Sequence, residues 1–196
     1  MKRVILAITG ASGAILGIRA LELLKEAGAE THLIVSQAAR RTIPDETGRN
    51  VAEVEVLAAF CYDPGDIGAR IASGSFVTDG MLVVPCSIKT LSGIANSYAE
   101  DLVVRAADVC LKEGRRLLLA VRETPLHPGH LRLMRLAAEA GAVIFPPIPS
   151  FYGHPGTVDD LVTDLAGRML LRMGIENERY RRWGGDEKPG PDPERA

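Results

Sequence analysis

Short apolar runs alternate with amphipathic stretches along most of the chain. Five of these runs are predicted to be buried strands, at residues 4–8, 31–35, 81–84, 117–121 and 142–146. A helical pattern follows each run, and strands that alternate with helices indicate a parallel sheet with helices on both faces. The pattern therefore predicts a single α/β domain.

The helical stretches complete this prediction. The first has an aliphatic stripe and ends before Gly28, which suits a helix C-terminus because glycine tolerates positive φ. Residues 87–114 are predicted to form a second, long helical region, and residues 158–173 a third. We expect a Rossmann-like (flavodoxin-like) domain over residues 1–184. Residues 185–196 are rich in proline, glycine and charge, so we expect a disordered tail there.

Composition excludes several classes of function. The formal net charge of -2 comes from mixed acids and bases, so neither a nucleic-acid groove nor a polybasic membrane patch is expected. The apolar run near the N-terminus is too short for a signal peptide or a membrane span, which favours a cytoplasmic protein. The three cysteines lack Cys-x-x-Cys spacing, which argues against a disulfide framework and a structural zinc site.

Ligands of open α/β sheets bind at the carboxyl ends of the strands, so the loops there are the candidate sites. The first is the turn Thr-Gly-Ala-Ser-Gly at residues 9–13, whose small side chains would let backbone N–H groups approach a phosphate. A tight turn that binds nothing is the alternative. Gly10, Gly13 and Gly17 miss the G-x-G-x-x-G spacing of dinucleotide sites, and Ser36 stands where those sites place a carboxylate. FMN therefore fits better than NAD.

The loop after the third strand reads Pro-Cys-Ser-Ile-Lys-Thr at residues 85–90. Ser87 and Thr90 flank a helix start and can present hydroxyls and backbone N–H groups to a flavin ring edge or a phosphate. A plain helix cap is the alternative, and Cys86 is expected to be a small buried residue.

The fourth strand ends in Arg122 and Glu123, a cation beside a carboxylate. Adjacent residues of an extended chain point apart, so a salt bridge between the two is not the natural explanation. An exposed surface pair is the alternative to a catalytic pair. The residues that favour a site lie further along the chain and are aromatic or cationic: Phe151, Tyr152, Arg168, Tyr180 and Trp183. For Trp183, a structural role in capping the core is an equal alternative.

In order and spacing, these motifs resemble the UbiX-type flavin prenyltransferases. The resemblance covers residues 3 to about 184 and rests on short motifs at residues 9–13, 72–75, 85–91, 105–109, 122–126, 151–152 and 181–184. Members of this family attach a dimethylallyl group to N5 and C6 of reduced FMN, and the product serves partner decarboxylases of the UbiD type. The resemblance therefore implies a transferase that makes a cofactor and does not itself decarboxylate.

The family pattern implies two sets of site residues on this sequence. The residues assigned to FMN are Gly10, Ala11, Ser12, Ser36, Ser87, Ile88, Lys89, Thr90 and Arg122. The residues assigned to dimethylallyl phosphate are Lys112, Arg122, Glu123, Tyr152 and Arg168. Glu46, in what reads as a loop, matches a family carboxylate near the flavin. Lys112 would reach across from a neighbouring subunit, because the family forms trimers that assemble into dodecamers.

The implied chemistry needs positive charge around the departing phosphate, because both fragments develop charge in the transition state. Lys112, Arg122 and Arg168 would supply this charge, and Trp183 would shield the allyl cation with its π face. The sequence has no Asp-rich magnesium motif, so we expect no metal. Glu123 is the expected proton carrier.

The chain departs from the family pattern in one region, where Asp101 replaces the usual Asn and residues 97–100 replace a common Gly-x-x-Asp. Two other functions stay open. An FMN-dependent cysteine decarboxylase of the same fold would use a catalytic histidine and an Asn at the position of Lys89. However, the four histidines, His32, His127, His130 and His154, form no clear site, and two of them read as a loop and helix start. A non-enzymatic module that delivers flavin would not need cations for a second phosphate.

Overall fold

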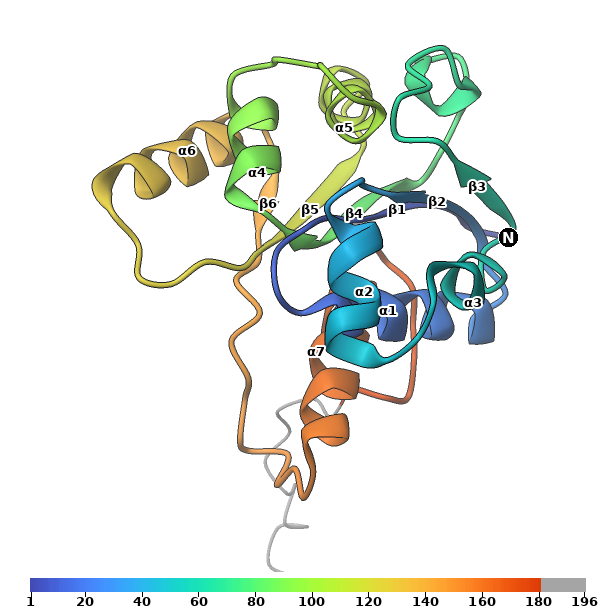
Figure 1. Ribbon diagram of the computed structural model, residues 1–196, viewed down its shortest axis with the longest axis vertical. Coiled ribbons are helices and arrows are strands. Elements are labelled where there is room, and N and C mark those ends of the chain that lie inside the picture. The colour runs from blue at the N-terminus through green and yellow to red at the C-terminus, as the bar shows by residue number, and fades with distance from the viewer. Residues whose placement is uncertain (181–196) are drawn as a thin grey trace, which may run out of the picture.

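A computed structural model of the chain describes residues 1–180, which contain one six-stranded parallel sheet (Figure 1). The strands are β1 (Arg3–Ile8), β2 (Glu30–Val35), β3 (Phe60–Tyr62), β4 (Gly80–Cys86), β5 (Arg116–Val121) and β6 (Val143–Ile144), in the spatial order β3-β2-β1-β4-β5-β6. Trp183 and the expected tail lie outside the described residues.

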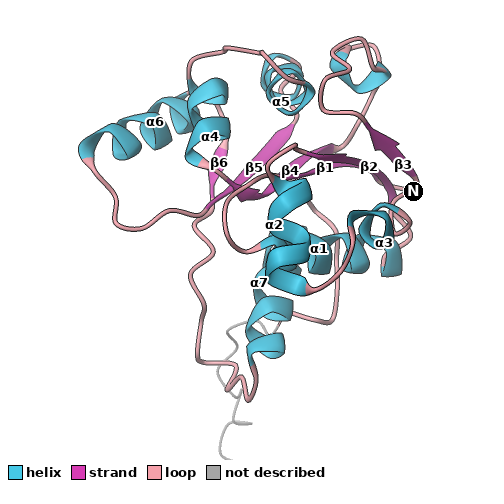
Figure 2. Cartoon of the chain, in the orientation of Figure 1, coloured by secondary structure: helices cyan, strands magenta, loops and turns pink. Residues whose placement is uncertain are grey.

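Helices cover both faces of the sheet (Figure 2). The elements are α1 (Ala14–Glu26), α2 (Ala39–Thr47), α3 (Val51–Glu55), α4 (Ile88–Ala95), α5 (Leu102–Lys112), α6 (Pro128–Glu139) and α7 (Val158–Arg172). The helices α1, α2, α3 and α7 lie on one face, and α4, α5 and α6 lie on the other (Figure 1). The expected Rossmann-like (flavodoxin-like) class is confirmed.

The central strand β1 shows why both faces are apolar. Its side chains alternate between the two sides, so Leu6 packs toward α1 and α7 while Ile5 packs toward α4 and α5. The next strands extend to opposite sides of β1, with β2 on one side and β4 on the other. This reversal is the switch point at which doubly wound sheets bind ligands, outside the carboxyl ends of the strands.

Two elements differ from the sequence prediction because packing outweighs local pattern. The stretch around Glu46 is the end of helix α2 and not a loop, even though Pro44 lies inside the helix. Ala39 and Ile43 are fully buried on the inner side of α2, and Gly48 ends it with φ of 68°. Strand β3 was not predicted because it has only three residues and two of them are exposed.

The predicted long helix at residues 87–114 is in fact two helices, α4 and α5. Between them Ser97 has φ of 51°, in the left-handed region, and Asp101 caps α5 by accepting a hydrogen bond from the N–H of Val104 (3.0 Å). The family pattern puts glycine at position 97, which is the residue that this conformation favours.

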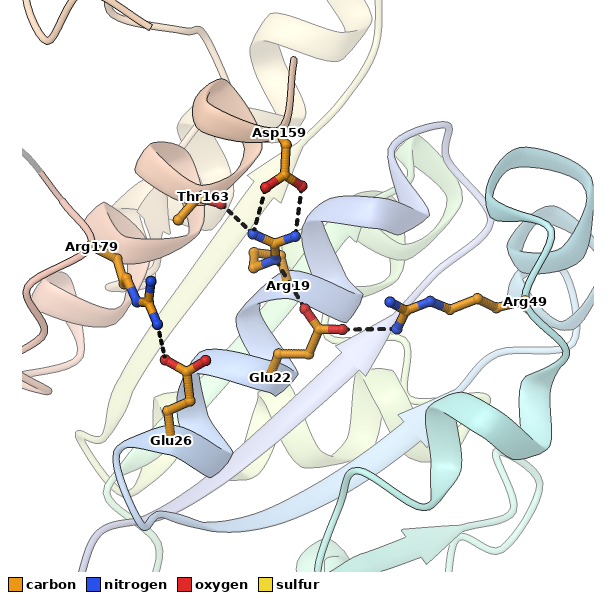
Figure 3. A network of polar contacts seen from close by, with 7 residues as sticks. All are labelled: Arg19, Glu22, Glu26, Arg49, Asp159, Thr163 and Arg179. Carbon is orange, nitrogen blue, oxygen red and sulfur yellow. Dashed lines mark hydrogen bonds and ion pairs between the residues drawn. The ribbon is translucent and has the colours of Figure 1, made fainter. Parts of the chain in front are cut away.

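Helix α7 docks on α1 through a polar network that Figure 3 shows. Arg19 of α1 makes a paired contact with the Asp159 carboxylate, with N···O distances of 2.7 and 3.2 Å, and also binds Thr163. Arg19 is held in place by Glu22 (2.9 Å). A bidentate guanidinium–carboxylate pair fixes orientation as well as contact, so the network sets how α7 lies against α1.

No helix within residues 1–180 combines the length and the apolar character that crossing a membrane requires.

The conformation of Ser97 leads to a prediction about stability. We expect Ser97→Gly to raise the free energy of unfolding by about 0.5–1 kcal/mol, because glycine removes the cost of a left-handed residue with a Cβ. The control is Ser92→Gly inside α4, which we expect to lower it by about the same amount. Urea unfolding of the two variants measures both effects, and two changes of the same sign would contradict the prediction.

Candidate active site

The loops that follow β1, β2 and β4 surround one cavity at the switch point. Its volume is about 630 Å³, within the range of about 300–1,000 Å³ that is usual for small-molecule sites. The structure brings five of the predicted flavin-binding residues together in its lining: Gly10, Ser36, Ser87, Lys89 and Thr90. The five come from separate parts of the sequence, so the sheet topology assembles this set.

A buried threonine joins the first and third of these loops. Thr9, which is 1% exposed, donates a hydrogen bond from its hydroxyl to the Pro85 carbonyl oxygen (2.7 Å). The same hydroxyl accepts a hydrogen bond from the Ser87 N–H (2.9 Å). Thr9 therefore fixes the start of α4 relative to the end of β1.

One glycine of the first loop and one of helix α1 are required by close packing. A Cβ on Gly10 would collide with Ala38 at the start of α2, and a Cβ on Gly17 would collide with the Val84 carbonyl oxygen of β4. Gly17 therefore lets α1 lie close to the sheet, and Gly10 lets the first loop lie close to the start of α2.

The start of α4 presents polar groups to the cavity. The Ser87 hydroxyl accepts a hydrogen bond from the Thr90 N–H (3.3 Å) and donates one to the Thr90 hydroxyl (3.1 Å). The N–H groups of Ile88 and Lys89 belong to the first turn, where amides have no acceptor within the helix and are suited to an anion. Cys86 is buried as expected, and burial raises the pKa of its thiol to about 12, so it is not a nucleophile.

The side chain of Lys89 is engaged within the chain. Its ammonium group binds the Asp101 carboxylate (2.9 Å), and this hydrogen bond raises the pKa of Lys89. The Asn that is usual in the family at position 101 would retain the cap on α5 but would lose the charge. Lys89 is therefore available to a ligand through its backbone rather than through its ammonium group.

An anion does lie at the start of α1, but it belongs to the protein. The Glu46 carboxylate accepts hydrogen bonds from the N–H groups of Gly13 (2.8 Å) and Ala14 (3.0 Å). Burial raises the pKa of Glu46, but these bonds, the Ser12 hydroxyl and the charge of Arg122 outweigh it, so the net pKa is lowered. These two amides of the predicted phosphate turn are thus already bound to a carboxylate.

The loop after β5 begins beside the cavity. The Arg122 N–H donates to the Cys86 carbonyl oxygen (3.1 Å). The positive charge of the Arg122 guanidinium helps to lower the pKa of Glu46 at the switch point. Glu123 is exposed, and its carboxylate accepts a hydrogen bond from the Thr124 N–H (3.0 Å). No ion pair joins Arg122 to Glu123 among the described residues.

Two further predicted residues, Tyr152 and Arg168, lie in a second cluster on the β6 side. The Tyr152 hydroxyl lies 2.5 Å from the Tyr180 hydroxyl. The Arg168 guanidinium lies 5.9 Å from the ring centre of Tyr180 and 5.9 Å from that of Phe145. The cluster combines a phenol pair with a cation.

Lys112 is not near either group of residues. It is the last residue of α5, which leads to the amino end of β5, so it lies at the edge of the sheet opposite the cavity. Its ammonium group binds the Glu113 carboxylate (2.6 Å).

Sequence reasoning missed Thr9 as the link between the loops, and it missed the cavity wall at residues 63–65. That wall follows β3, so recognising the short strand would have directed attention to it. Thr9 offered no signal of its own, because its role depends on contacts 76 residues away.

Comparisons with known proteins agree on one family. The flavoprotein family matches residues 1–169. The flavin prenyltransferase UbiX of Escherichia coli (strain K12) is 54% identical over 188 residues, which cover 94% of this chain and 100% of that protein.

Two solved structures have the same fold over nearly the whole chain. AnUbiX (PadA1) in complex with FMN and dimethylallyl pyrophosphate has a TM-score of 0.92 and 47% identity, covering 94% of this chain and 98% of that one. A dodecameric FMN-dependent UbiX-like decarboxylase from Escherichia coli O157:H7 has a TM-score of 0.91 and 49% identity, covering 93% and 100%. The chain therefore belongs to the flavoprotein family and, within it, to the UbiX flavin prenyltransferases.

Proposed function

We propose that this chain transfers the dimethylallyl group of dimethylallyl phosphate to N5 and C6 of reduced FMN and thereby makes prenylated FMN for a UbiD-type decarboxylase. The observation that carries the proposal is 54% identity to a flavin prenyltransferase over that protein's full length. The cavity at the switch point supports it independently.

The residues around this cavity fit FMN. The hydroxyls of Ser36, Ser87 and Thr90 and the first amides of α4 are proposed to hold the cofactor, with Gly10 in the lining of the cavity. When bound, reduced FMN supplies the nucleophilic ring atoms. Glu46 would orient Ser12, with which it shares a hydrogen bond, toward the bound ring.

The second substrate is assigned to the cationic residues. Arg122 and Arg168 are proposed to hold the phosphate and to stabilise its charge as the allylic C–O bond breaks. Tyr152 would donate a hydrogen bond to a phosphate oxygen, and Glu123 would place a proton on the leaving phosphate. Trp183, outside the described residues, keeps its proposed role of shielding the allyl group.

Lys112 completes this set only if another subunit supplies it. Within one chain it lies at the opposite edge of the sheet, so the proposed phosphate contact requires an assembly. Ile148, Phe151 and Val158 are all more than two-thirds exposed, which is typical of a surface that packs against another subunit. The dodecameric relative supports the same assembly for this chain.

The alternative functions have less support. A cysteine decarboxylase needs a histidine at the cofactor, but none of the four histidines lines the cavity, and His32 is fully buried between Glu30 and Tyr62. His127 caps α6, as predicted for a helix start. A flavin-delivery module does not account for Arg168 and Tyr152, which lie together outside the cavity. We also propose a cytoplasmic location, because all three cysteines are free thiols.

The cavity assignment predicts a binding phenotype. Ser87→Ala should raise the dissociation constant for FMN by roughly tenfold, because it removes a hydroxyl from the proposed phosphate contacts. The matched control, Ser92→Ala on the same helix, should bind FMN normally because Ser92 does not line this cavity. Calorimetry measures both. Tight binding of NAD without binding of FMN would contradict the assignment.

The proposed site stabilises the phosphate with fixed cationic side chains and not with a metal. We therefore expect the reaction to be insensitive to chelators. In the presence of excess EDTA, the wild-type protein should form prenylated FMN at a nearly unchanged rate, as followed by mass spectrometry without oxygen. Parallel reactions with dimethylallyl phosphate and dimethylallyl pyrophosphate test the donor. A rate that collapses with EDTA and returns with magnesium would refute the expectation.

The role of Glu123 predicts that binding and chemistry separate. Glu123→Gln should keep both substrates bound but slow the formation of prenylated FMN by roughly a hundredfold, because glutamine retains the size of glutamate but carries no exchangeable acid proton. Arg168→Ala should instead weaken the binding of dimethylallyl phosphate. Single-turnover kinetics distinguish the two variants, and a normal rate for Glu123→Gln would make the Arg122–Glu123 pair a surface feature.

A further inference from the structure

The segment that follows α7 contributes a residue to which the proposed reaction assigns no role. Tyr180 is the last described residue of this segment, and its hydroxyl lies 2.5 Å from that of Tyr152. Its ring also lies beside the Arg168 guanidinium. One side chain thus contacts two of the residues proposed to hold the phosphate.

The position of Tyr180 is fixed by contacts on both sides of the segment. Asn177 donates to the Gly167 carbonyl oxygen of α7 (2.9 Å) and accepts from the Tyr180 N–H (3.2 Å). On the other side, Arg179 pairs with Glu26 of α1 at 3.1 Å (Figure 3). A short segment held at both α7 and α1 places the Tyr180 hydroxyl in one location.

Gly167 shows how closely this segment lies against α7. A Cβ there would lie 2.8 Å from the Asn177 side-chain oxygen, 3.0 Å from the Tyr180 nitrogen and 3.1 Å from the Tyr180 Cβ. These distances are shorter than ordinary carbon contacts. Any larger residue at position 167 would therefore displace Tyr180.

Either phenol can be the donor in the hydrogen bond between Tyr152 and Tyr180. The bond to Tyr152 raises the pKa of Tyr180, burial raises it further, and the charge of Arg168 opposes both effects. A phenol has one proton, so when the Tyr152 hydroxyl donates to a phosphate oxygen, Tyr180 is the donor within the pair. A hydroxyl that accepts a hydrogen bond becomes a better donor through its own proton, because chains of hydrogen bonds polarise one another.

We propose that Tyr180 is a positioning residue for the donor substrate: its hydroxyl turns and polarises the Tyr152 hydroxyl toward the phosphate, while its ring holds the Arg168 guanidinium. The inference rests on the proposed function, because it takes Tyr152 and Arg168 as phosphate ligands. The cation–π contact keeps the guanidinium near the phenol pair, so that both groups approach the same anion. Tyr180 itself forms no bond to the reacting atoms.

The test removes only the hydroxyl. Tyr180→Phe retains the ring beside Arg168, so it should raise the KM for dimethylallyl phosphate and the inhibition constant of inorganic phosphate by roughly three- to tenfold. The dissociation constant for FMN and the thermal midpoint should stay the same. The control is Tyr98→Phe, which removes a hydroxyl from a largely exposed tyrosine on another part of the surface and should change neither constant.

A coupling measurement separates positioning from packing. If Tyr180 acts through Tyr152, the Tyr152→Phe and Tyr180→Phe effects on the phosphate constant should not add, and the double variant should resemble Tyr152→Phe alone. Gly167→Ala should reproduce the weaker phosphate binding, even though alanine favours the helix by about 1 kcal/mol. If Gly167→Ala weakens phosphate binding although alanine favours the helix, the loss is explained by displacement of the segment that carries Tyr180.

The outcomes distinguish the inference from the proposed function. A wild-type enzyme that makes prenylated FMN, with Tyr180→Phe indistinguishable from it in both phosphate constants, overturns the inference alone. Additive effects of the two phenylalanine variants also overturn it. A wild-type protein that makes no prenylated FMN from either donor overturns the proposed function and the inference with it.

Discussion

The cavity at the switch point depends on one buried hydroxyl at the carboxyl end of the central strand β1. Thr9 bonds to Pro85 and Ser87 at once, so the end of β1 and the start of α4 cannot move independently. Both loops line the cavity, so this bridge fixes the relative position of two of its walls. A buried hydroxyl that loses a partner leaves an unsatisfied polar group, which makes the arrangement costly to distort. The rigid floor therefore comes from β1 and β4, and the ligand contacts come from the loops above it.

Much of the fold could be predicted because its signal is periodic and local. The runs that form β1, β2, β4 and β5 are buried on both sides and mostly apolar, as is typical of parallel strands, and α7 begins and ends close to its predicted limits. Strand β3 and helix α2 could not be read in this way. β3 is exposed at Phe60, and α2 contains Pro44, so tertiary packing decides both.

In the candidate site, too, local features could be predicted and tertiary contacts could not. Residues at strand ends, such as Ser36 and Ser87, could be found because the topology of an α/β sheet directs attention there. The sequence did not indicate which groups the charged residues of the site bind. Glu46 binds amides 33 and 32 residues earlier in the chain, and Lys89 pairs with Asp101 across two helices. Such pairings depend on how the helices pack, which neither periodicity nor a single motif contains.

The docking of α7 on α1 has a consequence for how the chain is synthesised. Arg19 and its partner Asp159 are 140 residues apart, so the outer face of α1 stays uncovered on the ribosome until α7 has emerged. The strands β1 to β5 all precede α7 in the chain, so they can emerge and pair before it. Arg168 and Tyr180 follow all six strands in the chain. A chain cut before residue 158 would therefore retain the sequence of every strand but would lack these two members of the cluster on the β6 side.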